Sequence, residues 1–530
     1  MTGAARGALD GAEDREFAIR LKHITKRFGH VVANRSISLD VVAGSIHGIV
    51  GENGAGKSTL MSILYGFYQA DSGHIEIRGE RVRIRSSRAA IDVGIGMVHQ
   101  HFMLVDTFTV LENVMLGAET GARLGPAITH ARAALQRLSD TFGIEVDPHA
   151  ICGSLSVGAR QRVEILKALY RGAEILVLDE PTGVLTPQEA DQLFVVLRAL
   201  RARSVTVLLI THKLREILAI TDSVSVMRAG EIVGTVATAE TSREALAELM
   251  VGRKVLLDVA KSARVAQAPV LQVDALCVAS EGVRRAVDAV TFNVRAGEIV
   301  GIAGVAGNGQ SELLEALAGI RAVASGQFSV GEHCVTPRQP CGPREMRSLG
   351  VAHVPEDRLR AGLVADFSAL DSALLGYQDD PAYSRYGFLS YQAITAHCNH
   401  CIEQFDVRPA DASLRTGGFS GGNQQKLLLA RELGRNPKLL LVGQPTRGVD
   451  IGAIELIHRR LIEMRDAGAA VLLVSVELDE IMSLSDRILV MFEGRIVADV
   501  NAASTTEREL GLMMANAHSS SDGNVSEGAS

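Results

Sequence analysis

The sequence lacks the features that mark three classes of protein. No stretch approaches the roughly 18 consecutive apolar residues that a membrane-spanning helix needs. Lys and Arg together number 54 against 61 for Asp and Glu, and this net charge of -7 gives no support for nucleic-acid binding, for which a strongly basic stripe is expected. The N-terminal stretch MTGAARGALDGAEDREF carries acids and has no apolar core, so we do not expect a secretory signal.

Cysteine is also scarce. Six cysteines in 530 residues do not indicate a disulfide framework and favour a reducing compartment. Cys398 and Cys401 form a single C-x-x-C motif in a segment with a helical pattern. No second pair lies near enough in the sequence to complete four metal ligands, so we interpret the motif as two reduced thiols on a helix. A metal or redox site is the alternative.

What is present is an ordinary globular composition, with 47% hydrophobic and 22% charged residues, arranged as an internal repeat. Residues 297–309 (GEIVGIAGVAGNG) mirror residues 44–56 (GSIHGIVGENGAG), residues 420–425 mirror 156–161, and residues 439–445 mirror 175–181. The chain is therefore predicted to be a duplicated α/β unit. The expected parts are a polar arm (1–16), a first unit (17–256), an alanine-rich joint (257–269), a second unit (270–515) and a low-complexity, disordered tail (516–530).

A phosphate-binding loop is predicted at residues 51–59 (GENGAGKST), which fit the pattern G-x-x-x-x-G-K-[ST]. A strand pattern precedes it at residues 45–50, and a helix pattern follows at residues 60–65. The glycines allow successive N–H groups to point at phosphate oxygens, and the helix adds its positive N-terminal end. Lys57 can then reach the β- and γ-phosphates, and the Ser58 hydroxyl can bind Mg²⁺.

Polar residues follow three other strand patterns of the first half. Asp179 and Glu180 end EILVLDE, Gln100 ends GIGMVHQ, and His212 follows SVTVLLI. Ligands of open α/β sheets bind at the carboxyl ends of strands, so these side chains are expected to gather beside the phosphate loop. Asp179 can hold Mg²⁺, Glu180 can polarise the attacking water, Gln100 can bridge metal and water, and His212 can donate to the γ-phosphate. A purely structural role is the alternative for each of them.

The motifs GENGAGKST, MVHQ, LSVGARQR, ILVLDEPT and ITHK occur in the order found in ATP-binding cassette (ABC) ATPases, which the chain resembles over residues 17–515. The resemblance implies an α/β fold of two tandem P-loop ATPase domains, each with a RecA-like core, an antiparallel β subdomain and a helical signature subdomain. It implies ATP and Mg²⁺ as cofactors. Cassettes of this family pair head to tail, so each ATP lies between one phosphate loop and the other cassette's signature.

The resemblance also implies a set of site residues. The catalytic residues are Glu180, His212 and Gln100, and the metal ligands are Ser58, Gln100 and Asp179. Phe28 matches the aromatic residue that stacks on adenine, with core packing as the alternative. The residues expected to bind the nucleotide are Phe28, Gly51, Glu52, Asn53, Gly54, Ala55, Gly56, Lys57, Ser58 and Thr59 from the first half, and Ser420, Gly421, Gly422, Gln424 and Asp450 from the second.

The second half departs from the family at its own nucleotide site. The residues that match Lys57, Gln100, Asp179, Glu180 and His212 are Gln310, Glu356, Gly443, Gln444 and Val476. That half is thus expected to lack the cation, the metal-holding carboxylate, the catalytic acid and the imidazole. Its signature (Ser420-Gly421-Gly422) is intact, whereas the first half has Ser156-Val157-Gly158, and Asp450 is matched by Thr186. Head-to-tail pairing then predicts one hydrolytic site and one site that at most holds a nucleotide.

The resemblance extends to the tandem carbohydrate and nucleoside importers, through PTRGVDIGA (445–453) and through MVHQHFMLVDTFTVLENVMLG (97–117), which is typical of the nucleoside and simple-sugar branch. It implies two separate permease subunits, an extracytoplasmic solute-binding lipoprotein and a peripheral place on the cytoplasmic side of the cell membrane. Residues 102–114 would receive the permease coupling helices, with internal packing as the alternative. A ribose or galactose motor is the near alternative. A soluble ABC protein acting on ribosomes is disfavoured, because those proteins keep both sites intact.

Overall fold

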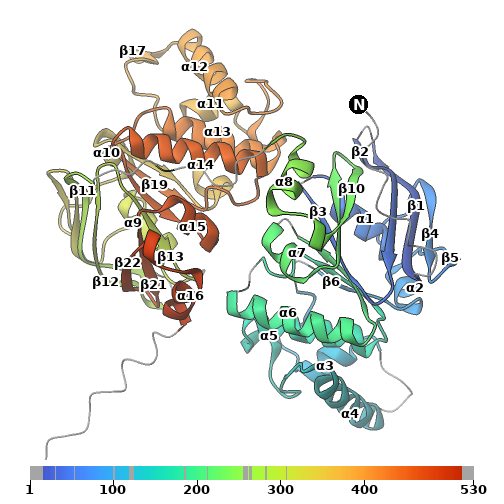
Figure 1. The fold of residues 1–530 in the computed structure, drawn as a ribbon. Helices are drawn as coiled ribbons and strands as arrows, with labels where there is room; N and C mark the ends of the chain where they lie inside the picture. Colours follow the sequence, from blue (N-terminus) through green and yellow to red (C-terminus); the bar gives the residue numbers. More distant parts are fainter. Residues whose placement is uncertain are drawn as a thin grey trace, which may run out of the picture. The chain divides into compact units, whose positions relative to one another are not determined.

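The computed structural model describes residues 16–29, 31–52, 54–99, 102–118, 124–183, 185, 187–211, 213–254, 261, 266–280, 283–305, 307–449 and 451–515. The chain divides into two compact units, Met1–Val255 and Leu256–Ser530, and each is treated by itself (Figure 1). The expected tail lies outside the described residues, as do residues 1–15 of the expected arm and most of the expected joint.

The first unit begins with an antiparallel sheet in the order β2-β1-β4-β5. Apolar residues alternate along the first strand and lie in the core, as Ile19, Leu21 and Ile24 show. The strands are β1 (Phe17–Phe28), β2 (Val31–Val42), β4 (Ser72–Ile77) and β5 (Glu80–Val82). The antiparallel β subdomain that the resemblance implies is therefore present in the first unit.

The second sheet of this unit has the order β10-β9-β3-β8-β7-β6, and all but β10 run parallel. The strands are β3 (Ile46–Gly51), β6 (Ile95–Val98), β7 (Ile175–Asp179), β8 (Thr206–Ile210), β9 (Ser223–Arg228) and β10 (Glu231–Ala237). Strands β3, β6 and β8 are buried along their whole length, as expected for a parallel sheet covered on both faces. The carboxyl ends of β3, β8, β7 and β6 therefore share one edge.

Some helices of the first unit pack against this sheet, and others form a separate group at one end of the unit. Helices α3, α4 and α5 pack on one another, away from the antiparallel sheet (Figure 1). The helices are α1 (Lys57–Leu64), α2 (Ser87–Asp92), α3 (Val110–Met115), α4 (Leu124–Phe142), α5 (Val157–Tyr170), α6 (Pro187–Ala202), α7 (Leu214–Ile220) and α8 (Arg243–Val251). These three parts are the core, β subdomain and helical subdomain expected from the resemblance.

The second unit repeats this plan. Its antiparallel sheet has the order β12-β11-β14-β15, and its larger sheet has the order β16-β19-β20-β13-β21-β22, the same neighbours as in the first unit. The strands are β11 (Pro269–Ser280), β12 (Val283–Arg295), β13 (Ile299–Ala303), β14 (Ser325–Val330), β15 (His333–Val335), β16 (Val351–Val354), β19 (Leu439–Gly443), β20 (Ala470–Val474), β21 (Arg487–Phe492) and β22 (Arg495–Asn501). The predicted duplication is confirmed at the level of strand order.

The helical parts of the second unit also correspond, with one addition. A short hairpin of β17 (Ser384–Arg385) and β18 (Phe388–Leu389) precedes α12. The helices are α9 (Gln310–Leu317), α10 (Pro343–Ser348), α11 (Ala369–Leu374), α12 (Tyr391–Gln404), α13 (Gly421–Leu433), α14 (Ile451–Asp466), α15 (Leu478–Leu484) and α16 (Glu507–Ala515). No helix within the described residues is both long and apolar enough to cross a bilayer.

The C-x-x-C pair lies on α12 inside the helical core. Cys398 and Cys401 are 0% and 2% exposed, and both thiols are free. Burial raises the pKa of Cys398 to about 12 and that of Cys401 to about 11, so both thiols stay protonated at neutral pH. The His397 Nε2 lies 3.5 Å from the Cys401 Sγ. The geometry supports the interpretation of two structural thiols.

Candidate functional site

The first phosphate loop is shaped by glycines that no other residue could replace. A Cβ on Gly51 would lie 2.3 Å from the Met227 carbonyl oxygen, and one on Gly56 would lie 2.2 Å from the Ala33 carbonyl oxygen. Gly56 also has a φ of 97°, which L side chains rarely adopt, and it caps the start of α1. The sequence predicted this helix from residue 60, but it begins at Lys57, so the lysine belongs to the helix and not to the loop.

Lys57 lies inside the curve of the loop. Its side chain is 6% exposed, and its Nζ donates hydrogen bonds to the carbonyl oxygens of Gly51 at 2.6 Å and Glu52 at 3.0 Å. Burial lowers the pKa of Lys57, while the nearby carboxylates of Glu180, Asp179 and Glu52 raise it. A buried ammonium flanked by carboxylates is a site with a strong local field, where a phosphate group and a metal ion can both be bound.

Asp179 and Glu180 lie beside this lysine, as the sequence predicted. The Ser58 hydroxyl donates a hydrogen bond to the Asp179 carboxylate. Burial, and next the charge of Glu180, raise the pKa of Asp179, while Lys57 and the Ser58 hydrogen bond lower it. A carboxylate and a hydroxyl in contact, backed by a second carboxylate, form an oxygen-rich donor set of the kind that Mg²⁺ prefers.

Glu180 lies just beyond β7 in a strained conformation. Its φ of 47° falls in the left-handed region, and its N–H donates to the Ile210 carbonyl oxygen at 2.8 Å. Such a conformation costs about 1–3 kcal/mol for a residue with a side chain and is typical of functional positions. The chain therefore leaves the sheet at Glu180, whose carboxylate lies close enough to Lys57 to raise the pKa of that ammonium.

Several expected site residues cannot be located. Asn53, Gln100, His212 and Asp450 lie outside the described residues, as does Thr186. Their roles stay predictions.

Glu216, which the sequence did not indicate as a site residue, connects the segment after β7 to the segment after β8. The Thr182 hydroxyl donates to Glu216 at 2.6 Å, and the Thr211 hydroxyl donates to the Glu216 Oε2 at 3.3 Å. Thr182 lies two residues after Glu180, and Thr211 directly follows β8. Glu216 on α7 thereby fixes the chain after both strands. No local motif marks it, because its partners come from two separate loops.

Phe28 ends β1 with its side chain partly in solvent. It is 42% exposed, its ring lies edge-on to Tyr68 at 5.2 Å, and the Lys26 ammonium lies 5.5 Å from its centroid. The alternative of core packing is therefore not supported. A partly exposed ring with an aromatic neighbour can stack on a base, and Tyr68 is an addition to the predicted set.

The second phosphate loop keeps the shape of the first but loses its charge. Gly309 has a φ of 99°, and a Cβ there would lie 2.0 Å from the Ala286 carbonyl oxygen, as at Gly56. The Gln310 Nε2 donates to the Val305 carbonyl oxygen at 3.1 Å, which repeats the Lys57 contact with Glu52. A neutral amide thus replaces the ammonium in a loop of the same form.

The acids of the second site are rearranged. At the end of β19, Gln444 repeats the strained φ of Glu180 with a value of 49°, and its amide side chain accepts a hydrogen bond from the Val476 N–H at 3.3 Å. Gly443 replaces Asp179, so β19 supplies no carboxylate. Glu356 supplies one instead, because its Oε2 accepts a hydrogen bond from the Ser311 hydroxyl at 2.7 Å. The predicted loss of the Asp179 carboxylate is seen at Gly443, and the carboxylate of this site comes from Glu356, two residues after the end of β16.

The signature of the second unit is held by an arginine that sequence reasoning missed. Ser420 precedes α13, and its Oγ accepts from the Asn423 amide at 2.8 Å. The Arg358 Nε donates to the Gln424 Oε1 at 3.1 Å. A Cβ on Gly421 would lie 2.3 Å from a terminal nitrogen of this guanidinium, so a larger residue there would displace the Arg358 side chain. Arg358 is distant in sequence and gave no motif signal.

The signature of the first unit carries a carboxylate. The Glu189 Oε1 accepts from the Gly158 N–H at 3.2 Å and lies 3.5 Å from the Ser156 Oγ. The N–H groups at the start of α5 are those that would bind a phosphate oxygen. A negative charge already on them opposes an anionic ligand, which agrees with the altered Ser156-Val157-Gly158 sequence.

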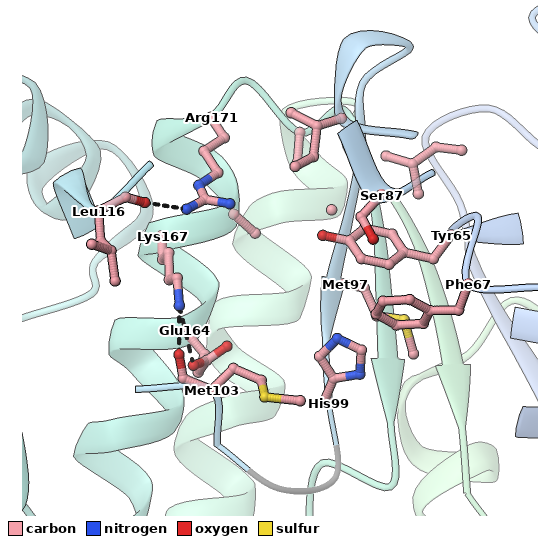
Figure 2. Close-up of a pocket in the computed structure, with 15 residues that line it drawn as sticks. Tyr65, Phe67, Ser87, Met97, His99, Met103, Leu116, Glu164, Lys167 and Arg171 are labelled. Carbon is pink, nitrogen blue, oxygen red and sulfur yellow. Dashed lines mark hydrogen bonds and ion pairs between the residues drawn. The ribbon is translucent and has the colours of Figure 1, made fainter. Parts of the chain in front are cut away.

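A cavity of about 310 Å³ lies in the first unit between α5 and the end of β6 (Figure 2). Tyr65, Phe67 and His99 form one wall, with ring centroids 5.3–5.9 Å apart. The other wall carries Lys167, whose Nζ donates to the Met103 carbonyl oxygen at 2.7 Å, together with Glu164 and Arg171. Burial raises the pKa of Glu164 and lowers that of Lys167.

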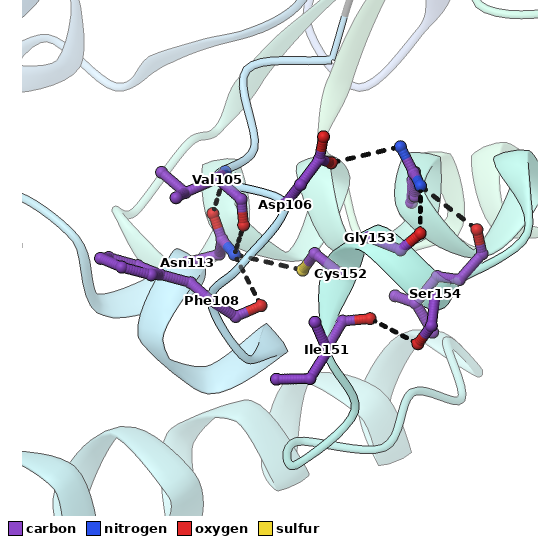
Figure 3. Close-up of polar contacts among 10 residues, drawn as sticks. Val105, Asp106, Phe108, Asn113, Ile151, Cys152, Gly153 and Ser154 are labelled. Atoms are coloured by element: carbon purple, nitrogen blue, oxygen red, sulfur yellow. Dashed lines mark hydrogen bonds and ion pairs between the residues drawn. The ribbon is translucent and has the colours of Figure 1, made fainter.

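The expected docking segment, residues 102–114, forms part of this cavity and part of the core. Met103 is 58% exposed and lines the cavity, whereas Val110 and Val114 are 0% exposed. Asn113 is also buried: it accepts from the Val105 N–H at 2.8 Å and donates to the Val105 carbonyl at 3.0 Å and the Cys152 sulfur at 3.2 Å (Figure 3). Internal packing therefore holds for Val110, Asn113 and Val114, and the docking role of the segment stays a prediction.

Comparison with known proteins agrees with this geometry. The family model described as ABC transporter matches residues 34–183 and 287–447. The nucleoside import ATP-binding protein NupA of Lactococcus lactis is 46% identical over 94% of this chain and 98% of its own length. The guanosine import ATP-binding protein NupO of Bacillus subtilis is 48% identical over the same shares. The glucose import ATP-binding protein TsgD13 of Haloferax volcanii is 45% identical over 94% of this chain and 96% of its own length. Because these relatives extend over nearly all of the sequence and the family model matches both units, the chain belongs to the ABC transporter family of ATP-binding proteins.

Proposed function

We propose that this chain is the ATP-hydrolysing subunit of an importer for a nucleoside or a simple sugar, and that hydrolysis takes place at the first phosphate loop. The observation that carries this assignment is the difference between the two loops. Lys57 is buried among carboxylates, with Glu180 turned toward it, whereas the second loop has the neutral amides of Gln310 and Gln444. A neutral amide can neither balance phosphate charge nor accept a proton from water.

The residues of the first unit divide the work of phosphoryl transfer. Lys57 and the first N–H groups of α1 bind the β- and γ-phosphates. Ser58 and Asp179, already in contact, fit a Mg²⁺ ion, which neutralises phosphate charge when bound. Glu180 orients and deprotonates the attacking water. Gln100 and His212 keep the roles implied by the family, at the metal and at the γ-phosphate.

The second unit supplies its signature to this reaction. Ser420, Gly421 and Gly422 stand at the start of α13, and within the described parts of the chain no carboxylate accepts from their N–H groups. In the first unit, by contrast, the Gly158 N–H donates to Glu189. A helix N-terminus of this kind stabilises the charge of a γ-phosphate. Asp450 and Gln424 are part of the same proposal, which rests on the family's head-to-tail pairing.

The cavity beside α5 is the proposed contact with a permease subunit. Its aromatic wall offers apolar area, and Lys167 and Arg171 offer donors to carbonyl or acidic groups of a docked helix. The importer would further contain a second permease subunit and an extracytoplasmic solute-binding lipoprotein. Through the permease, the chain would lie on the cytoplasmic side of the cell membrane.

The solute follows from the relatives and not from this chain. Two of the relatives import nucleosides or guanosine by name, and one imports glucose. A nucleoside is therefore proposed first, and a monosaccharide of the ribose or galactose type is the alternative.

The test is reconstitution of the chain with its permease subunits in proteoliposomes, with solute-loaded binding protein added. We expect solute-stimulated ATP hydrolysis and uptake, both abolished by Glu180→Gln while ATP binding persists, because this change removes only the proton acceptor. Co-sedimentation of the native chain with ribosomes instead of membranes would contradict the importer assignment.

A further inference from the structure

Residues 78–88 of the first unit (RGERVRIRSSR) form a basic segment in an otherwise acidic chain, and we call them the arginine segment. The segment holds five arginines and one glutamate, a local charge of +4, whereas the whole chain has a net charge of -7. It leads from the turn before β5 (Glu80–Val82) to the start of α2 (Ser87–Asp92). None of these arginines belongs to the phosphate-binding residues described above.

Three of the arginines face solvent on one side of the chain. Arg81, Arg83 and Arg85 are exposed. Between them, Val82 is half-buried and Ile84 is 7% exposed, and both pack in the core of the first unit. Alternate residues of an extended segment lie on opposite sides, so this burial pattern directs the three guanidinium groups outward together.

The same three arginines have no acidic partner within the described residues. The flanking Arg78 and Arg88 are ion-paired with Glu174 and Asp92. No carboxylate in the described part of the chain pairs with the other three. Because arginine keeps its proton throughout the physiological pH range, three positive charges are available to an anionic partner.

The second unit repeats the strand pairing of this edge but not its charge. Val82 of β5 pairs with Ile75 of β4, and Val335 of β15 pairs with Phe328 of β14 in the same way. By this register, the residues of the second unit that match Arg81, Arg83 and Arg85 are Cys334, Thr336 and Arg338. The fold of this edge therefore forms without three arginines.

The arginine segment adjoins the cavity that is proposed to receive a permease subunit. Ser87 and Ile91, from the helix that the segment leads into, line this cavity (Figure 2). Phe67 lines it too and is 52% exposed. Gly66, the residue before Phe67, packs against Ser86, since a Cβ there would lie 2.6 Å from the Ser86 carbonyl oxygen. An exposed aromatic ring and the arginines thus share one edge of the first unit, next to the proposed permease contact.

We propose that Arg81, Arg83 and Arg85 bind anionic phospholipid headgroups on the membrane that contains the permease. The inference rests on the proposed function, because the permease brings this edge to the bilayer. Guanidinium groups bind phosphate oxygens through paired, charge-assisted hydrogen bonds. Each arginine near an anionic membrane surface strengthens binding about fivefold, so three of them give about 100-fold.

The chemistry of this edge fits a lipid surface better than a nucleic acid. Basic residues beside an exposed aromatic ring are typical of segments that lie at a membrane interface. A nucleic acid requires a basic stripe that follows its backbone, and the arginine segment is short in a chain whose net charge is -7. Such a surface binds lipid weakly by itself and adds to a contact that the permease already provides.

The test measures the affinity of the full-length chain for proteoliposomes that hold its permease subunits. The lipid is phosphatidylcholine alone or a mixture with about one third phosphatidylglycerol, which is anionic. At about 0.1 M salt, the mixture should tighten the Kd of the wild type about 100-fold, and about 1 M salt should remove this gain by screening. The triple variant Arg81→Gln, Arg83→Gln, Arg85→Gln should lose the gain and keep the wild-type Kd on phosphatidylcholine.

The matched control is a triple variant on α6 and the residue after it, Arg198→Gln, Arg201→Gln, Arg203→Gln. It removes the same charge from three exposed positions of the same unit and should keep the gain. An equal wild-type Kd on both lipids, a gain that survives in the arginine-segment variant, or a gain lost equally in the control would overturn the inference. So would tighter binding of RNA than of lipid at equal phosphate concentration, if that variant loses it.

Vesicles of phosphatidylglycerol without the permease separate this inference from the proposed function. The wild type should partition onto them about 100-fold more strongly than the arginine-segment variant. If the chain does so but does not bind permease proteoliposomes of phosphatidylcholine, the proposed permease contact fails and the lipid site stands. If neither the vesicles nor the mixed proteoliposomes distinguish the wild type from the variant, the lipid site fails.

Discussion

The Arg358 guanidinium donates a hydrogen bond from its Nε to the Gln424 Oε1 over 3.1 Å, and from a terminal nitrogen to the Arg447 carbonyl oxygen over 3.2 Å. Arg358 begins the turn Arg358–Gly362, two residues after Glu356. Gln424 lies in the first turn of α13, whose N-cap is Ser420. A three-residue segment thus links the acid of the second phosphate loop to the signature of the same unit.

Arg358→Ala is expected to lower the kcat for ATP about tenfold, or about 1.4 kcal/mol in the barrier, with little change in KM. Arg358 acts as a positioning residue for the signature, so its loss should affect the transition state more than binding at the first phosphate loop. Arg360→Ala, an exposed change in the same turn, is the control and should behave as wild type. A proportional rise in KM, or an equal loss in the control, would contradict this role.

Lys57→Ala is expected to reduce ATP hydrolysis at least 100-fold, because the only ammonium within the first loop is lost from a buried site that stabilises phosphate charge. The matched change Gln310→Ala removes a neutral amide from the second loop and should leave hydrolysis within about threefold of wild type. Turnover of the reconstituted transporter gives both values. Equal losses in the two variants would refute the assignment of hydrolysis to the first unit.

The local parts of this site could be predicted from the sequence. A side chain at Gly51 or Gly56 would collide with a backbone carbonyl oxygen, so both positions must be glycine. The fixed spacing of these two glycines is what makes the phosphate loop recognisable in the sequence. The duplicated plan was predictable from the repeat. The strand before the phosphate loop was predictable from its apolar run, which forms the buried parallel strand Ile46–Gly51.

Contacts between distant residues could not be predicted in the same way. Glu356 aligns with Gln100, so the motif alone gave no reason to expect its carboxylate on Ser311; that contact depends on the missing side chain at Gly443. Arg358 and Gln424 are separated by 66 residues, and a pairing at that distance leaves no periodic signal. The positive φ of Glu180 could not be predicted either, because it accompanies a backbone hydrogen bond to Ile210, a residue that is distant in the sequence.

Ser420→Arg is expected to reduce hydrolysis at least tenfold more than Ser156→Arg. The first change places a bulky side chain at the signature proposed to face the hydrolysed ATP. The second alters a signature whose N–H groups are already bound by Glu189. Both variants carry the same new charge, so a general electrostatic effect cancels in the comparison. ATPase rates at saturating ATP decide the matter, and similar losses would count against the pairing of the first loop with the second signature.

Asn113→Ala is expected to loosen the segment between the docking cavity and the first signature. Its side chain joins Val105 to Cys152, and the same segments are tied by the Cys152 N–H donating to the Phe108 carbonyl oxygen at 2.9 Å (Figure 3). Removal leaves the partly buried Val105 N–H and carbonyl without this partner, which costs up to about 1–3 kcal/mol for each group that water does not reach.

Hydrogen exchange measures this effect locally, which matters because a chain of two units has no single unfolding free energy. The amides of Val105 and Cys152 should exchange about 100-fold faster in Asn113→Ala, equivalent to about 2.7 kcal/mol of local opening. Gln136→Ala, which removes an exposed bond to Asp140 on α4, is the control and should leave both amides unchanged. Because Cys152 lies four residues before Ser156, a wild-type exchange rate at both amides would mean that Asn113 does not link the two segments. Faster exchange confined to Val105 would show that Asn113 holds only the loop and leaves the signature segment to its own hydrogen bonds.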